Sequence, residues 1–150
     1  MPQLRHRKTP ANRDGRIRYG ETKAGAATRI FHLCQPRAVI FSPDGRLLAA
    51  AGRCDGNRGQ LKVWQVADGR LLCRAELGPG GNPVIAFSPN STVMASTGDG
   101  IGLSIWKLPA GVLQRAVIVE KPVLHLAFSD EGKTLIGLCA DGGILQFPAP

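Results

Sequence analysis

The sequence FSPNSTVMASTGDGIGLSIW, from Phe87 to Trp106, contains the pattern on which the whole chain is built. It reads as the end of an apolar strand, a tight turn, a second apolar strand, a Gly/Asp turn and a third strand that closes on tryptophan. The same pattern comes before it, from Phe41 to Trp64, and again after it, from Phe128 to Phe147. A multi-strand unit that recurs about every 40–45 residues is typical of the blades of a β-propeller.

The spacing of the aromatic residues supports this interpretation. The leading phenylalanines lie 46 and 41 residues apart, and the closing aromatic residues lie 42 and 41 residues apart. The second and third units align without a gap, whereas the first unit carries four extra residues within Arg53–Gly59. Six aromatic residues are therefore predicted to be structural, namely Phe41, Trp64, Phe87, Trp106, Phe128 and Phe147.

The turn after each leading phenylalanine has its own chemistry. Pro43 and Pro89 preset φ for the first corner of a type I turn, and Gly45 supplies the left-handed position that closes the hairpin. The second unit reads Asn90-Ser91 in place of Asp-Gly, and asparagine tolerates positive φ better than most residues. Each of these positions therefore favours a hairpin turn.

The pattern FSPDGRLLAA followed by GQLKVWQVADGRLL resembles the WD-repeat β-propeller family, over roughly residues 37–147. The Phe-Ser-Pro-Asp-Gly turn and the 19-residue step from phenylalanine to the closing aromatic residue carry this resemblance. The family's Trp-Asp dipeptide is absent, since Gln65, Lys107 and Pro148 follow the closing aromatic residues, and no Gly-His pair precedes the first strand. Of the family's buried hydrogen-bond network the chain keeps the two tryptophans with Ser96 and Asp141. These divergent repeats are therefore expected to rely on packing.

The predicted fold class is all-β, a partial β-propeller of about three four-stranded antiparallel blades. The propeller segment covers residues 28–150, with blades at about 37–77, 84–119 and 123–147 and a short strand at 28–33. Residues 1–27 contain almost no large apolar side chain, so burial cannot offset the entropy of ordering them. A disordered basic arm is expected there.

Most of the positive charge belongs to this arm. The chain carries a formal net charge of +8, of which residues 1–30 contribute +6. One reading is a solvated tail, and another is an arm that contacts the phosphates of a nucleic acid. The residues that would make those contacts are Arg5, Arg7, Lys8, Arg13, Arg16 and Arg18.

The cysteine pattern argues against a structural metal site. The four cysteines, Cys34, Cys54, Cys73 and Cys139, show no Cys-x-x-Cys spacing and no nearby histidine pair. Cys73 and Cys139 lie in apolar strand runs, which favours small core residues over disulfide partners. There is no apolar run of membrane-spanning length and no apolar leader, so no membrane partner and a cytoplasmic location are expected.

No pattern in the chain predicts catalysis. Ala127–Thr134 matches a loose phosphate-binding loop, but it aligns with two hairpins that lack Lys-Thr and is followed by a strand instead of a helix. His6, His32 and His125 have no nearby nucleophile or carboxylate in the sequence. The chain is therefore expected not to be an enzyme, with no catalytic residues, no cofactor and no metal.

The function predicted from the sequence is a non-catalytic protein–protein interaction scaffold. The insertion in the first unit is a candidate contact loop, in which Arg53, Asp55, Asn57 and Arg58 would meet an unidentified protein. The alternatives are a nucleic-acid-binding platform that uses the basic arm, and a fragment of a larger propeller without independent function.

Self-association is a further hypothesis from the sequence. Three blades do not make a usual ring, because propellers close with about 4–8 blades. Thr28–Leu33 reads as an outer strand without a blade, and the third unit ends without an outer strand. A homodimer in which Thr28–Leu33 pairs beside Ile144–Phe147 of the other chain would complete a six-bladed ring.

Overall fold

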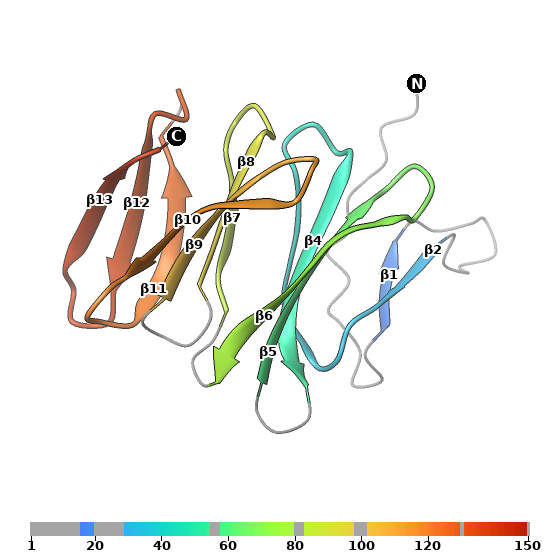
Figure 1. Cartoon of the computed structure of the whole chain (residues 1–150), viewed down its shortest axis with the longest axis horizontal. Helices are drawn as coiled ribbons and strands as arrows, with labels where there is room; N and C mark the ends of the chain where they lie inside the picture. Colours follow the sequence, from blue (N-terminus) through green and yellow to red (C-terminus); the bar gives the residue numbers. More distant parts are fainter. Residues whose placement is uncertain are drawn as a thin grey trace.

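The computed structural model describes residues 16–19, 29–54, 58–79, 83–97, 102–129 and 131–149, and every regular element among them is a β-strand (Figure 1). Three antiparallel sheets follow one another along the chain, and Figure 1 shows them standing side by side as a row of blades. The predicted all-β, partial-propeller architecture is confirmed.

The strands follow each other within each blade in chain order. Blade I consists of β3 (Pro36–Phe41), β4 (Leu47–Cys54), β5 (Arg58–Gln65) and β6 (Leu71–Pro79). Blade II consists of β7 (Ile85–Phe87), β8 (Val93–Thr97), β9 (Gly102–Lys107) and β10 (Val112–Ile118). Blade III consists of β11 (Val123–Phe128), β12 (Thr134–Cys139) and β13 (Ile144–Pro148). The first strands β3, β7 and β11 neighbour one another, so they form the inner side of the row.

A separate two-stranded sheet precedes blade I. It pairs β1 (Arg16–Tyr19) with β2 (Arg29–His32) in antiparallel register, so that Ile17 lies opposite Phe31. Strand β2 leads into the first strand of blade I, as β6 and β10 lead into the blades that follow them. We therefore call the β1–β2 sheet the half-blade, because it takes the place of the outer two strands of a preceding blade.

Within the predicted arm of residues 1–27, the structure has strand β1 at Arg16–Tyr19. The sequence Arg-Ile-Arg-Tyr alternates charged and large side chains with the period of a strand. Strand β2 supplies the backbone partners of this short strand. No local pattern in the sequence predicts that pairing. Residues 1–15 and 20–28 lie outside the described residues.

One kind of interface joins blade I to blade II. Each blade turns a back face toward the preceding unit and a forward face toward the following one. On the forward face of blade I, Ala49, Leu61 and Val63 pack into one buried cluster with Met94 and Trp106 from the back face of blade II. Fully buried apolar side chains of this size contribute about 1.5–3 kcal/mol each.

The same interface joins blade II to blade III. On the forward face of blade II, Ala95, Leu103 and Ile105 are buried against Leu135 of blade III, and Phe147 packs beside them. Ala95 and Ala49 occupy corresponding positions in their blades, as do Leu103 and Leu61. The chain therefore stabilises itself by repeating one blade-on-blade contact.

Both tryptophans are buried, as the sequence predicts, with exposed fractions of 5% for Trp64 and 9% for Trp106. The Nε1–H group of Trp106 donates a hydrogen bond of 3.0 Å to Oγ of Ser96. Trp64 packs on the half-blade, where its ring centroid lies 5.2 Å from that of Phe31. Asp141 does not join such a network, since it is exposed in a turn and its carboxylate contacts Lys121 and the Gly143 amide.

The three hairpin turns at one rim share a left-handed residue. Gly45 has φ 73°, Gly132 has φ 69°, and the corresponding residue of blade II, Ser91, has φ 61°. In the second unit serine, and not Asn90, adopts positive φ. Oγ of Ser91 accepts a hydrogen bond of 3.2 Å from the backbone N–H of Asp44, which ties the turn of blade I to that of blade II.

We predict that Ser91→Ala destabilises the protein by about 1–2 kcal/mol, because the hydrogen bond is lost while the strained backbone remains. Ser91→Gly loses the same bond but relieves the strain, so it is expected to be the more stable of the two variants. Urea denaturation of both variants measures the difference. A Ser91→Gly variant less stable than Ser91→Ala would contradict this account.

We predict that Trp106→Ala costs roughly 3–5 kcal/mol of unfolding free energy, because it empties a large volume from the interface between blades I and II. Leu113→Ala is the control, since Leu113 lies opposite Trp106 on β10 but is 47% exposed. Urea midpoints are the measurement. An unchanged midpoint for Trp106→Ala would show that this interface does not stabilise the fold.

Candidate protein-binding surface

The forward face of blade III is open to solvent. Alternation along the strands places six side chains on it, two from each strand. Leu138 lies between His125 and Ile144 in the register, and Ile136 lies between Ala127 and Gln146. Ile144 is 72% exposed, Ile136 39% and Leu138 38%. We call this surface, His125, Ala127, Ile136, Leu138, Ile144 and Gln146, the open face.

The corresponding positions of the other two blades are covered. The residues aligned with the open face are Ala38, Ile40, Ala49, Ala51, Leu61 and Val63 in blade I, and Val84, Ala86, Ala95, Thr97, Leu103 and Ile105 in blade II. Those on the second and third strands are all at most 2% exposed, because the next blade packs on them. The open face therefore corresponds to the faces of blades I and II that pack on the next blade, and no described residue covers it.

The open face carries no lysine, arginine, aspartate or glutamate. The solvent-exposed face of a sheet normally carries polar and charged side chains. The centres of protein interfaces, in contrast, are depleted in charge. The composition of this face is thus that of a contact surface, and contiguous exposed apolar surface commonly marks a site of interaction.

The open face also differs from its counterparts in bulk. At the two central positions of the second strand, blade I has Ala49 and Ala51, whereas blade III has Ile136 and Leu138. Alanine at these positions lets the next blade approach closely, and overpacking a close contact with extra methylenes is unfavourable. A surface that covered blade III would therefore need recesses for two large side chains.

The outer edge of blade III is open as well. In blades I and II the third strand pairs with a fourth, β6 or β10. Strand β13 pairs only with β12 among the described residues. The second row of backbone N–H and C=O groups on β13 can accept an added strand. The open edge and the open face both belong to blade III, so they adjoin each other.

Part of the candidate contact loop belongs to two strands of blade I. Arg53 and Cys54 extend β4, and Arg58 and Gly59 extend β5, with Cys54 opposite Arg58 in the register. Most of the insertion therefore lengthens a hairpin. Arg58 is exposed at the start of β5. The other two candidate residues, Asp55 and Asn57, lie outside the described residues.

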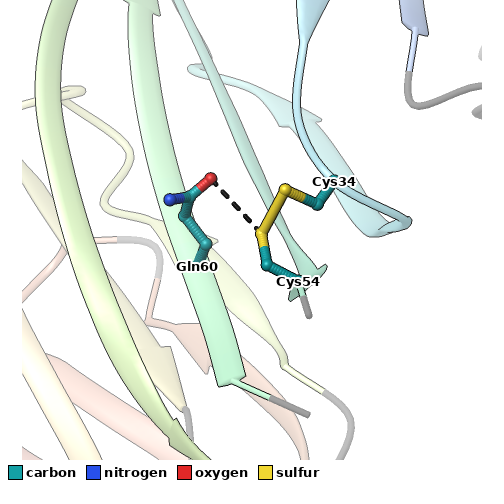
Figure 2. Close-up of a disulfide and its surroundings, with 3 residues drawn as sticks. All are labelled: Cys34, Cys54 and Gln60. Atoms are coloured by element: carbon teal, nitrogen blue, oxygen red, sulfur yellow. Dashed lines mark hydrogen bonds between the residues drawn. A yellow bond between two sulfur atoms is a disulfide. The ribbon is translucent and has the colours of Figure 1, made fainter. Parts of the chain in front are cut away.

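A disulfide joins Cys34 to Cys54 beside this hairpin, with a Cα–Cα distance of 5.0 Å (Figure 2). Sequence reasoning missed this bond. The signal was present, because Cys34 precedes the first strand of blade I and Cys54 ends the second, and an antiparallel hairpin brings such positions together. Cys73 and Cys139 are buried free thiols, which confirms their prediction as core residues.

The basic arm stays a prediction. Arg5, Arg7, Lys8 and Arg13 lie outside the described residues. Arg16 and Arg18 belong to strand β1, where they are backbone partners of His32 and Ile30. The nucleic-acid hypothesis is neither supported nor contradicted by these positions.

The described part of the chain has neither a metal-binding cluster nor a membrane-spanning helix. No group of three or more His, Cys, Asp or Glu side chains lies close enough there to hold a metal ion. Nor does any helix in that part have the length and apolar character to cross a membrane.

Two comparisons with known proteins bear on this architecture. Residues 27–65 match the family described as "WD domain, G-beta repeat". The chain is also similar to Centriole proteome protein 16 of Chlamydomonas reinhardtii, with 31% identity over 124 residues. That alignment covers 80% of this chain but 6% of the relative, so the chain spans a small part of that protein's length.

The row of antiparallel blades, with one closing aromatic residue per blade, defines a partial β-propeller. The residues that match the WD-repeat family model span β2 and the first three strands of blade I. WD-repeat proteins are generally non-catalytic protein-interaction scaffolds.

The rim turn of blade I provides a titratable group with a defined environment. The Ser42 hydroxyl donates a hydrogen bond of 2.6 Å to the Asp44 carboxylate, and the Arg46 amide donates one of 3.0 Å. These bonds lower the pKa of Asp44 below its ordinary value of 3.8. A lowered folded-state pKa contributes stability that is present above the unfolded pKa and lost as pH falls through the folded pKa.

We predict that Ser42→Ala raises the pKa of Asp44 toward its ordinary value, because the largest stabilising bond to the carboxylate is removed. An NMR titration of the Asp44 carboxyl carbon measures this shift. Ser129→Ala, the same change in the turn of blade III, is the matched control and should leave Asp44 unaffected. An Asp44 titration that does not move in Ser42→Ala would contradict the assignment.

Proposed function

We propose that this chain is a non-catalytic scaffold that binds a protein through the open face of blade III. The observation that carries the proposal is the contrast between this face and the equivalent faces of blades I and II. The same repeat position is at most 2% exposed at Ala95 and Leu103 but 39% and 72% exposed at Ile136 and Ile144. The chain thus displays to solvent the kind of surface that it buries elsewhere.

The hydrophobic effect supplies the driving force for such binding. Each square ångström of apolar surface that is removed from water contributes about 25 cal/mol. Strands β12 and β13 offer three large aliphatic side chains on the open face, Ile136, Leu138 and Ile144. Leu124, at the irregularity in β11, is also exposed, at 49%.

The chemistry of the face supports binding over catalysis. Its single titratable side chain is His125, which stands among aliphatic and amide neighbours in the register. General acid–base catalysis requires a paired group within hydrogen-bond reach of a reacting atom. The face offers shape, apolar area and an unpaired strand edge, which are the elements of protein recognition.

A second copy of this chain is the partner that the two ends favour. The half-blade presents two outer strands, and blade III presents three strands without an outer one. Phe31 and Leu33 of the half-blade cover Trp64 on the back face of blade I, while Val39 and Phe41 on the innermost strand of that face remain partly exposed. The inner strands of blade III from another copy would fit beside the half-blade and cover them.

This contact between two copies corresponds to the homodimer hypothesis drawn from the sequence. It would place six blades around a two-fold axis and close the ring. Strand β2 already pairs with β1, so one of its two edges is occupied. Pairing of β2 with the partner's β13 would therefore use the other edge or displace β1.

We predict that the protein self-associates in a concentration-dependent manner and that Ile144→Asp shifts it toward the monomer, because a charge enters the centre of the interface. Ile118→Asp is the matched control, since Ile118 is 82% exposed on β10 outside the open face and should leave association unchanged. Light scattering and sedimentation velocity give the masses.

The outcomes separate the two levels of the proposal. A wild-type protein that stays monomeric at all accessible concentrations rules out self-association and leaves a different protein as the occupant. A wild-type dimer that Ile144→Asp does not weaken would show that the open face is not the contact, and the scaffold assignment to this face would fail.

A further inference from the structure

We propose that the Cys34–Cys54 bond is a thiol–disulfide exchange site whose oxidation state sets how firmly the half-blade covers the back face of blade I. The chemical class of its reaction partner is a small dithiol or a dithiol protein. This inference does not rest on the scaffold function, because it concerns the opposite end of the row of blades.

The bond sits at the junction between the two units. Cys34 follows directly after Leu33, a residue of the cluster that joins the half-blade to blade I. Cys54 is the last residue of β4, and the register pairs Pro36 with Gly52 nearby. The disulfide therefore ties the chain that leaves the half-blade to the end of the second strand of blade I (Figure 2).

The junction is tightly built around this bond. A Cβ atom on Gly52 would lie 2.4 Å from the Cys34 carbonyl oxygen and 2.6 Å from that of Gln35, so only glycine fits there. Gln35 has φ 30°, and its carbonyl accepts a hydrogen bond of 3.3 Å from the Arg53 amide. A non-glycine residue at positive φ persists only where its surroundings hold it. The disulfide is the covalent part of those surroundings.

Among the described residues, no strand pairing helps the disulfide to hold the half-blade against blade I. The half-blade forms its own two-stranded sheet and exchanges no ladder hydrogen bonds with blade I among the described residues. Its attachment consists of the packing of Phe31 and Leu33, each 3% exposed, on Trp64 and its neighbours, together with the junction. Loss of the cross-link therefore leaves the half-blade held by the main chain and by a small apolar contact.

The site is accessible to a reductant, and the other thiols are not. Cys34 is exposed and Cys54 is half-buried, whereas Cys73 and Cys139 are buried. Burial also raises the pKa of the Cys73 thiol, which disfavours its reactive thiolate. Exchange chemistry in the folded chain is therefore confined to one pair of cysteines.

The exchange proceeds in two balanced steps. A thiolate of the dithiol attacks the sulfur of Cys34, the more exposed residue of the pair. A mixed disulfide forms, and the Cys54 thiolate leaves and takes up a proton. The second thiolate of the reductant then attacks its own sulfur in the mixed disulfide and releases the Cys34 thiolate, which is protonated. Two electrons pass to the cysteine pair, and the dithiol becomes a cyclic disulfide. Oxidising compartments maintain such bonds and glutathione-poised ones open them.

The test uses Trp64 as the reporter in the full chain. Trp106→Phe leaves Trp64 as the sole tryptophan, because the chain has two. We expect acrylamide quenching of Trp64 to rise severalfold when dithiothreitol is added. Cys54→Ser in the same background should show the high quenching in both conditions. The reciprocal Trp64→Phe variant, which reports from Trp106 between blades I and II, should not respond to the reductant.

Two measurements on the unaltered protein keep the test decisive even where Trp106→Phe folds poorly. Mass spectrometry after iodoacetamide treatment should find two added groups, on Cys34 and Cys54, only in the reduced protein. Hydrogen exchange in the peptide that contains Trp64 should then be about tenfold faster or more, since a cross-link strongly restrains the chain it closes.

The proposal is overturned by either of two results. One is equal labelling of Cys34 and Cys54 with and without the reductant, which would mean that the bond does not form. The other is a bond that opens on reduction while the quenching and hydrogen exchange around Trp64 stay unchanged, which would mean that packing alone holds the half-blade.

Discussion

The structure depends on one constraint: a four-stranded blade has two apolar faces and cannot bury either by itself. Each blade must therefore pack on a neighbour, and here the contact is repeated with the same residue positions, Ala49 and Leu61 in blade I and Ala95 and Leu103 in blade II. The closing aromatic residue of the following blade fills the outer part of the contact, as Trp106 does. Stability in such arrays comes from nearest-neighbour interfaces, so the ends of the row are where surface remains unsatisfied.

The two ends meet this constraint by different means. At one end a half-blade covers Trp64, and a disulfide fastens its junction in place of strand pairing. At the other end the forward face of blade III is uncovered. Ile136 stands where both covered blades have alanine, and Leu138 stands where they have alanine or threonine. Bulk at Ile136 and Leu138 indicates that this face meets a surface unlike the back face of blade II. One end is thus held by chemistry that responds to thiols, and the other is available for protein binding.

The rim turns connect the blades at a finer level. The serine of each turn accepts a backbone hydrogen bond from the following strand, as Ser42 does from Leu47 and Ser129 from Thr134. Ser91 departs from glycine at the left-handed position, yet its hydroxyl bonds to the neighbouring turn at Asp44. A local conformational cost is thereby offset by a contact between blades. Serine therefore stabilises the hairpin turns and, at Ser91, also links two neighbouring blades.

Much of the fold follows from local patterns in the sequence. The 41-residue repeat, the turn residues and the closing aromatic residues predicted the blades, the burial of Trp64 and Trp106 and the core positions of Cys73 and Cys139, because each is a property of one strand or one turn. Other features depend on which distant segments meet. The pairing of Arg16–Tyr19 with β2 and the exposure of Ile144 have no local signature, since they arise only when strands take register and blades stack. The Cys34–Cys54 bond follows from the register of one hairpin and not from the spacing of the cysteines. Sequence periodicity determined the repeating unit, and tertiary packing decided which copy of that unit keeps an open face.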